Sequence, residues 1–413
     1  MKMYETLFEE KLDHLHQHNT YRYFLNVSKN ASQFPIFQYE KNGKSGEAIN
    51  FCSNDYLGLS VHEDVLQTCS NALGKCGIGS GGTRNISGTT SYHRSLEKRI
   101  AQWHQQPAAL LFGSAYMANL TTLQTIGRHI PGLIYISDER NHASLIEGMR
   151  SAGNSKYIFR HNDTRHLEEI LQSLPLTQPK LVVFESVYSM NGHIAPVAKI
   201  LSIARKYNAL TYVDEVHAVG VYGSSGAGIL EQEGLQKNID ILNGTLAKAV
   251  GVLGGYIVAS TTIIDFVRSY GSGFIFTTSL PPAICAGIEQ SIQIIQQESV
   301  LANRMHSLVK YLRTKLENEK IAYVHNQSHI TPIPIAGAEK CRMIATQLLE
   351  EFGVYVQPIN YPTVPMGEEC LRVIVTARHS RRQIDHFVTS LKRVGDATYP
   401  DHLQRQPSQL IAS

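Results

Sequence analysis

The chain has 413 residues, 43% hydrophobic and 18% charged, which is the composition of a globular protein. Its 38 basic and 35 acidic residues leave a formal charge of +3, which does not indicate a nucleic-acid-binding surface. No apolar run approaches the roughly 20 residues of a membrane span, and the amino-terminal segment lacks the apolar core of a signal peptide. The six cysteines are scattered without metal-binding spacing. We therefore expect a cytoplasmic, bacterial-type protein with reduced cysteines and no membrane, nucleic-acid or metal partner.

The chain is too long for one ordinary hydrophobic core. Residues 1–50 are expected to form a helix followed by an irregular arm. The pattern of residues 51–290 predicts a large α/β domain, and that of residues 291–398 a smaller α+β domain. Residues 399–413 are expected to form a disordered tail.

The large domain contains short apolar runs that alternate with helical stretches. The clearest lie at 133–137, 180–186, 209–215 and 256–260. This alternation predicts a mostly parallel sheet with helices on both faces. Ligands of such sheets bind at the carboxyl ends of the strands, so polar residues that follow strands are the first candidates for a site.

Lys248 lies in the run NGTLAKAVG, just after an apolar strand that ends in Thr245. An acidic strand end, Asp214 in the run TYVDEVHAVG, precedes it by about thirty residues. A confined lysine and a strand-end aspartate are typical of a pyridoxal phosphate site. The lysine would form the covalent bond to the cofactor, and the aspartate would keep the pyridine nitrogen protonated. The alternative, an ordinary surface lysine, does not explain the small residues on both sides.

Further side chains extend this hypothesis. His217 and Ser189 would approach the phenolic oxygen of the cofactor, and His142 would stack on its ring. Each of them could also be structural. The turn Ser114–Tyr116 opens a helix, and helix N-termini bind phosphate. The backbone groups of Ser114, Ala115 and Tyr116 are thus candidates for the phosphate, with the side chains of Thr245, Thr277 and Thr278.

Arg372 lies among apolar residues in the run CLRVIVTA. A buried arginine needs a partner, and a substrate carboxylate held by two hydrogen bonds is the simplest one. An internal salt bridge is the alternative. The glycine-rich run at 77–97 does not match a dinucleotide fingerprint, and we reject that interpretation.

Several longer runs resemble those of a known family. They are CSNDYLGLS, GGTRNISGTTSYHRSLE, SDERNHASLIEGMR, VFESVYSMNGHIAPV, LTYVDEVHAVGVYG, GTLAKAVG, RSYGSGFIFTTSLPP and VYVQPINYPTVPMGEECLRV. From about residue 4 to 395 the chain resembles the 5-aminolevulinate synthases. These belong to the α-oxoamine synthase group of pyridoxal phosphate enzymes, which have the aspartate aminotransferase-like fold. The resemblance implies a decarboxylating condensation of glycine with succinyl-CoA in a homodimer with active sites at the subunit interface.

The resemblance also implies a role for each candidate. The catalytic and cofactor-binding residues would be Lys248, His142, Asp214, His217, Ser189, Thr245, Ser114, Ala115 and Tyr116. Thr277 and Thr278 would reach the cofactor phosphate of the neighbouring subunit. Asn54, Tyr56 and Arg372 would position glycine, and Arg22, Thr83, Asn85 and Ile86 would recognise the succinyl group. Lys156 would lie near the CoA phosphates, and the segment in the 360s would close over the site.

Some positions depart from the family pattern: Ala115, Asn191, His193, Ala247, Ala377 and Arg378. None removes a group assigned to the chemistry, but together they suggest a diverged member that serves a specialised pathway. Two alternatives remain open. One is a sister enzyme that uses another acyl-CoA or amino acid, and the other is a catalytically inactive protein of the same fold that binds a partner.

Overall fold

The computed structural model describes residues 2–18, 20–41 and 43–398. The expected tail, 399–413, lies outside these residues. The chain separates into two compact units. The first contains the residues up to Ser53, the short stretch Met190–Gly192, and the residues from Arg304 onward. The second contains Asn54–Ser189 and His193–Asn303.

A seven-stranded sheet forms the centre of the second unit, within the described residues. Its order is β4 (Ala108–Phe112), β10 (Gly255–Ala259), β9 (Ile241–Thr245), β8 (Leu210–Asp214), β7 (Lys180–Glu185), β5 (Ile134–Asp138) and β6 (Lys156–Phe159). From β9 to β6 neighbouring strands pair in parallel, whereas β10 runs antiparallel to both β4 and β9. The predicted mostly parallel sheet is therefore confirmed.

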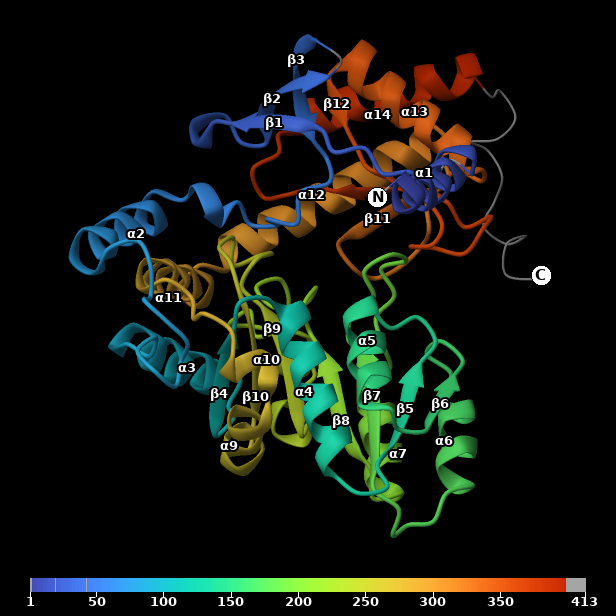
Figure 1. The fold of residues 1–413 in the computed structure, drawn as a ribbon. Helices are drawn as coiled ribbons and strands as arrows, with labels where there is room; N and C mark the ends of the chain where they lie inside the picture. Colours follow the sequence, from blue (N-terminus) through green and yellow to red (C-terminus); the bar gives the residue numbers. More distant parts are fainter. Residues whose placement is uncertain (1, 19, 42, 399–413) are drawn as a thin grey trace. The chain divides into compact units, whose positions relative to one another are not determined.

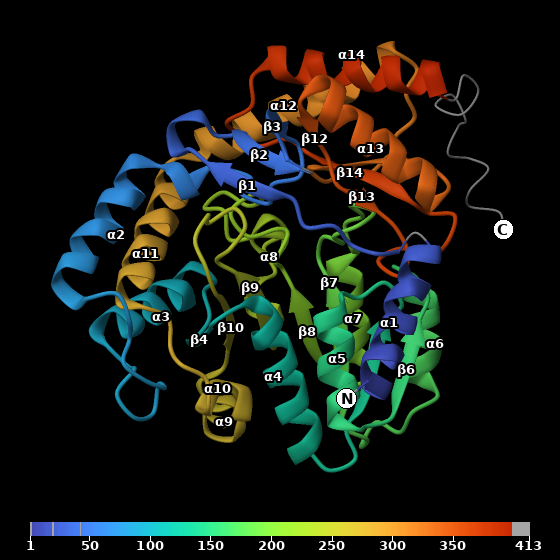
Figure 2. The same cartoon turned by 45° about the horizontal axis from the view of Figure 1, so that its top comes forward.

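Helices cover the sheet, as its buried apolar strands require. Their bounds are α2 (Glu63–Cys76), α3 (Ser91–Trp103), α4 (Ala115–His129), α5 (Ala143–Ala152), α6 (Thr164–Gln172), α7 (Val197–Lys206), α8 (Ile229–Gln232), α9 (Thr261–Tyr270), α10 (Ser272–Ile275) and α11 (Pro282–Gln297). Helices α4 and α5 lie side by side in front of the sheet in Figures 1 and 2. Leu123 of α4 and Leu145 of α5 pack there in one cluster with Tyr135, Val183 and Tyr212 of the strands.

In the first unit, α1 (Lys2–Gln17) is followed by β1 (Asn26–Lys29), β2 (Ile36–Lys41) and β3 (Lys44–Asn50). These strands form an antiparallel sheet, and β12 (Val354–Tyr355) joins β3 in parallel. The expectation of an irregular arm was therefore wrong. Every residue of β1 is exposed and only Phe37 of β2 is buried, so the apolar pattern of a strand is weak here. The sheet is completed by a strand about 300 residues away in sequence.

The rest of the first unit is α+β. It contains the helices α12 (Ser299–Asn318, from Arg304), α13 (Ala338–Phe352) and α14 (Arg381–Thr398), and the strands β11 (Ile330–Pro334), β13 (Pro358–Ile359) and β14 (Cys370–Ile374). Strand β14 pairs antiparallel with both β11 and β13. None of the helices in the described residues is long and apolar enough to cross a bilayer.

Candidate active site

Lys248 lies in a tight turn after β9. The turn is fixed by hydrogen bonds from Leu246 N to Gly254 O (2.9 Å) and from Gly251 N to Lys248 O (2.8 Å). Gly251 has a φ of +76°, and a Cβ there would lie 2.5 Å from Ser60 N, so the turn requires glycine. Ala247, which departs from the family pattern, is exposed and donates its N–H to Thr245 Oγ1. Its methyl group therefore does not distort the turn.

The amine of Lys248 meets a buried imidazole. Lys248 Nζ lies 2.9 Å from His217 Nε2, and His217 Nδ1 lies 2.6 Å from Tyr56 Oη. Tyr56 Oη also donates to Asn54 Oδ1 at 3.2 Å. A neutral imidazole has one N–H and one lone pair, so His217 can receive a proton on one side while it donates on the other. Lys248 is thereby held at the end of a hydrogen-bonded chain.

Asp214 ends β8 and is 4% exposed. Its Oδ2 accepts hydrogen bonds from Asn119 Nδ2 at 2.7 Å and Asn243 Nδ2 at 3.1 Å, and its Oδ1 accepts one from Val216 N at 2.8 Å. Three donors from three segments therefore fix the plane of the carboxylate. Such a fixed, buried acceptor suits a pyridine N–H.

His142 caps α5 and is linked to Asp214 through two side chains. Asn119 Nδ2 also donates to Ser144 Oγ at 2.9 Å, which lies 2.8 Å from His142 Nδ1. Burial lowers the pKa of His142, and the charge of Lys248 lowers it further, against an opposite effect of Asp214. The ring is therefore neutral near pH 7, as stacking on an aromatic cofactor favours.

Glu185 is an acidic residue of this site that the sequence did not reveal. It ends β7, pairs with Asp214 of β8, and accepts a hydrogen bond from His142 N at 2.6 Å. Burial, followed by the charge of Asp214, raises the pKa of Glu185 well above its usual range. Glu185 therefore holds the backbone of His142, and its raised pKa favours the neutral form beside Asp214.

The N-terminus of α4 contains the residues predicted to bind phosphate. Ser114 Oγ caps the helix by accepting from Met117 N, and the amides of Ala115 and Tyr116 precede the first intrahelical bond. Gly255 pairs with Thr245, and a Cβ on Gly255 would lie 2.1 Å from Ala115 N. The helix end thus lies against the β9–β10 pair, beside Thr245. The donors, the aspartate and the lysine together fit pyridoxal phosphate.

Some predicted residues lie elsewhere in the second unit. Thr278 forms an isolated bridge with Thr83, and Thr83 Oγ1 donates to Asn85 Oδ1 at 2.7 Å. Thr277 donates to Gly273 O. Ile86 is 81% exposed. These residues form one loop cluster, whereas Ser189 is buried on the segment after β7.

Lys156 is exposed at the first residue of the edge strand β6, away from the carboxyl ends of the strands.

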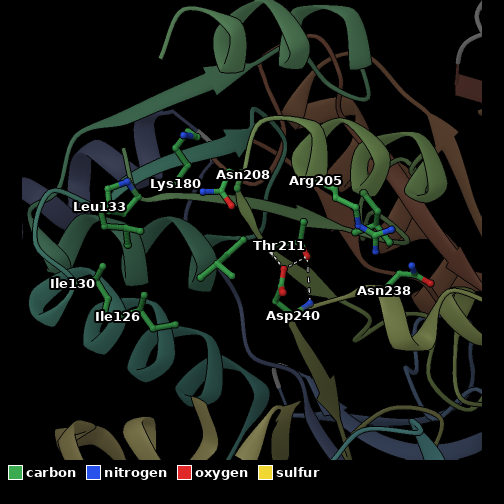
Figure 3. Close-up of a pocket in the computed structure, with 13 residues that line it drawn as sticks. Ile126, Ile130, Leu133, Lys180, Arg205, Asn208, Thr211, Asn238 and Asp240 are labelled. Atoms are coloured by element: carbon green, nitrogen blue, oxygen red, sulfur yellow. Dashed lines mark hydrogen bonds between the residues drawn. The ribbon is translucent and has the colours of Figure 1, made fainter. Parts of the chain in front are cut away.

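A cavity of about 410 Å³ lies at the amino ends of the strands, where Lys180 and Leu210 begin β7 and β8. Figure 3 shows Lys180, Asn208, Thr211 and Asp240 around it. Lys180 is buried like a functional lysine, but its Nζ donates to Pro175 O at 2.8 Å and Gln178 O at 2.7 Å. Its role is therefore structural.

Arg22 and Arg372 belong to the first unit. Arg22 lines a cavity of about 860 Å³, where its Nη2 donates to Thr363 Oγ1 at 3.3 Å. Thr363 was not predicted as a partner of Arg22, because the two residues are 341 positions apart in the sequence. Arg372 is buried on β14, opposite Pro332 of β11. The described residues contain no cluster of three or more histidine, cysteine, aspartate or glutamate side chains that could hold a metal ion.

The chain is similar to several known proteins. Residues 46–391 match the family "Aminotransferase class I and II". A 5-aminolevulinate synthase of Rhizobium meliloti is 46% identical over 389 residues, which cover 94% of this chain and 96% of the relative. The erythroid-specific, mitochondrial enzyme of Opsanus tau is 46% identical over 395 residues, 95% of this chain and 68% of the relative. A serine palmitoyltransferase of S. paucimobilis, solved with bound PLP–myriocin, superposes with a TM-score of 0.87 at 30% identity and covers 96% of this chain and 98% of its own.

The fold and the lysine–aspartate site define a pyridoxal-phosphate-dependent enzyme of the class I and II aminotransferase type. Within this class, the chain belongs to the 5-aminolevulinate synthase family. It is an acyltransferase.

Proposed function

We propose that the chain condenses glycine with succinyl-CoA and releases 5-aminolevulinate, CoA and CO₂. The proposal rests on one observation above all: Lys248 Nζ and His217 form a hydrogen-bonded pair in the same unit as the fixed carboxylate of Asp214. Pyridoxal phosphate, when bound, supplies an electron sink for a negative charge on the carbon next to an amine. All other parts of the reaction are assigned to residues of the chain.

Lys248 would hold the cofactor covalently, and its amine is the base assigned to remove a proton from the α-carbon of glycine. An amine in confined surroundings loses its proton more readily than one in water, which suits this role. His217 and Tyr56 orient the amine before the transfer. The same amine returns a proton to carbon after CO₂ has left.

Asp214 would hold the ring nitrogen of the cofactor, and His142 would stack on its ring. His217 and Ser189 are assigned to the phenolic oxygen. The amides of Ser114, Ala115 and Tyr116 and the hydroxyl of Thr245 would bind its phosphate. This assignment places the ring nitrogen of the cofactor at the buried acceptor that ends β8. It places the phosphate at the N–H donors that begin α4.

The carboxylates of the two substrates are assigned to the arginines. Arg372 is assigned to the carboxylate of glycine. Arg22 binds the succinyl carboxylate together with Thr363, whose hydroxyl its guanidinium already contacts. Lys156 is assigned to the CoA phosphates.

The enzyme is proposed to work as a homodimer, with Thr277 and Thr278 reaching the cofactor phosphate of the other subunit. Ile86 and Phe276 support this assignment, because they are 81% and 80% exposed on the same loop cluster as these threonines. Large apolar side chains gathered on a surface mark an interaction site. Sedimentation equilibrium should give twice the mass of the chain, and Phe276→Asp should shift it toward the monomer.

The direct test is product formation by the purified protein with pyridoxal phosphate and glycine. Succinyl-CoA is compared with acetyl-, butyryl- and octanoyl-CoA, and serine and alanine replace glycine in parallel. 5-Aminolevulinate from succinyl-CoA alone is the expected result. Turnover only with uncharged thioesters or another amino acid would identify a sister enzyme, and no turnover with any pair would support the inactive, partner-binding alternative.

A further inference from the structure

A buried carboxylate and two imidazoles are joined in a row by short polar contacts. Asp138 Oδ1, at the end of β5, lies 3.0 Å from His161 Nδ1. His161 Nε2 lies 3.1 Å from His193 Nδ1, and the two rings stack with centroids 5.2 Å apart and planes 18° apart. The side chain of Asp138 is fully buried, and that of His161 is 10% exposed.

The protons along this line can be assigned from its partners. Asp138 also accepts hydrogen bonds from Arg140 N and Asn162 N, so it acts as an acceptor and His161 Nδ1 carries a hydrogen. The contact between His161 Nε2 and His193 Nδ1 then needs one proton, and either ring can supply it. Two N–H groups face each other at 3.1 Å only when both rings are doubly protonated and positive.

The charged groups around the pair favour the singly protonated contact. Burial lowers the pKa of His193, and His161 and Arg140 lower it further, while Asp138 opposes them. Glu139 accepts the backbone N–H of His161 at 2.9 Å. The ring of Tyr188 packs edge-on against His161, with centroids 4.4 Å apart at 89°.

The pair is tied to the segment that carries Ser189. Tyr188 N donates to His193 O at 2.9 Å, and Val187 forms an antiparallel bridge with Ile194. Asn162 Nδ2 donates to Ile194 O at 3.4 Å. Residues 187–188 thus pair with residues 193–194, and His193 links this pair to His161. Ser189 follows directly after Tyr188 in the sequence.

We propose that His193 is a positioning residue, which shares one proton with His161 to hold the 186–195 segment and thereby Ser189. The inference rests on the proposed function of Ser189 as a cofactor ligand. When both rings are protonated, the contact breaks and the cofactor loses a correctly placed hydrogen bond. The enzyme should therefore lose activity on the acid side when this contact is broken.

Two variants of the full-length, cofactor-loaded protein test this. His193→Asn keeps a polar group near the position of Nδ1 but cannot titrate, and His193→Phe keeps a ring without any hydrogen bond. We measure kcat, the KM for glycine and the visible absorbance of the bound cofactor from pH 5 to pH 8. His193→Phe should lose about tenfold in kcat at every pH. His193→Asn should stay within about twofold at pH 7.5 and lack the acid loss of the parent.

The proposal is overturned if His193→Phe has the parental kcat and absorbance at pH 7.5, or if His193→Asn keeps the parental acid loss. If His193→Phe does not fold, the comparison of the parent with His193→Asn decides alone. Failure of the proposed function is separate, because it would show as absent 5-aminolevulinate formation by the parent at pH 7.5. In that case the pH dependence of the cofactor absorbance still tests the positioning role.

Discussion

Lys248 Nζ and His217 Nε2 are 2.9 Å apart, and the other nitrogen of the same imidazole lies 2.6 Å from Tyr56 Oη. The three residues come from different segments of one unit, and His217 is buried between the other two. A lysine held in this way loses the freedom that a surface lysine has. Its amine is thus oriented before any ligand binds, as both a covalent anchor and a proton carrier require.

Lys248→Ala should abolish steady turnover and the visible absorbance of the bound cofactor, because it removes both the anchor and the base. The fold should survive, since the lysine side chain is not part of the core. Assays of turnover and absorbance, with circular dichroism for the fold, check this. Lys237→Ala, at an exposed position, should match the parent. Normal turnover of Lys248→Ala would remove this lysine from the mechanism.

Asp214→Asn should lower kcat by about ten- to a hundredfold, because it removes a charge-assisted hydrogen bond of about 1.5–3 kcal/mol. The two amide donors from Asn119 and Asn243 would also lose a fully accepting partner. Steady-state kinetics at saturating cofactor separate this loss from weaker cofactor binding. An unchanged kcat would show that the ring nitrogen has another partner.

Arg372→Leu should raise the KM for glycine strongly. Losing a bidentate contact to the substrate carboxylate should cost on the order of 2–4 kcal/mol. Arg372→Lys keeps the charge but cannot donate two parallel hydrogen bonds. Its KM for glycine should therefore lie between those of Arg372→Leu and the parent. Glycine saturation curves measure this, and a parental curve for Arg372→Leu would place the carboxylate elsewhere.

Arg22→Leu should change the choice of acyl-CoA. Arg22 is exposed and bonded to Thr363 Oγ1, so we expect a loss of about tenfold in kcat/KM for succinyl-CoA. Butyryl-CoA, which has no terminal carboxylate, should be used no less well than by the parent. Equal losses for both thioesters would argue for a general packing defect in place of carboxylate recognition.

His104 should make the protein less stable in mild acid. Burial lowers the pKa of His104 to about 3 in the folded protein, whereas an unfolded chain binds this proton near pH 6.5. As the pH falls below 6.5, the unfolded state gains a proton that the folded state does not bind, so stability decreases. Between pH 6.5 and pH 5 this amounts to about 2 kcal/mol.

Urea unfolding at these two pH values measures the effect. His104→Gln, which can keep a hydrogen bond to Tyr256 Oη, should lose about 2 kcal/mol less stability over the same interval than the parent. The exposed His325→Gln should behave like the parent. If His104→Gln and the parent lost the same free energy of unfolding between pH 6.5 and pH 5, this explanation would be contradicted.

Local sequence was sufficient to predict the central sheet, and it also singled out Lys248 and Asp214 as candidate site residues. These features depend on short-range patterns: buried β-rich runs, a strand-end acid and a lysine among small residues. The supports of Asp214 were not predicted, because Asn119 and Asn243 become neighbours only when α4 packs on β9. Their sequence signal was an amide inside an otherwise apolar helix or strand.

Other parts could not be read from local patterns either. The strands β1–β3 expose most of their side chains, and their sheet is completed by β12. In the sequence, Glu185 does not differ from an ordinary strand-end acid. Its role becomes visible only in the hydrogen bond that its Oε1 accepts from His142 N. Thr363 depends on a contact with an arginine at the other end of the chain.

The most direct test of the account is to locate the covalent link to the cofactor. The purified protein with pyridoxal phosphate is reduced with borohydride, digested and mapped by mass spectrometry. The account predicts one modified lysine, Lys248, and loss of activity in proportion to its modification. Modification at Lys180 or another lysine, or an unmodified Lys248 in fully inactivated protein, would contradict it.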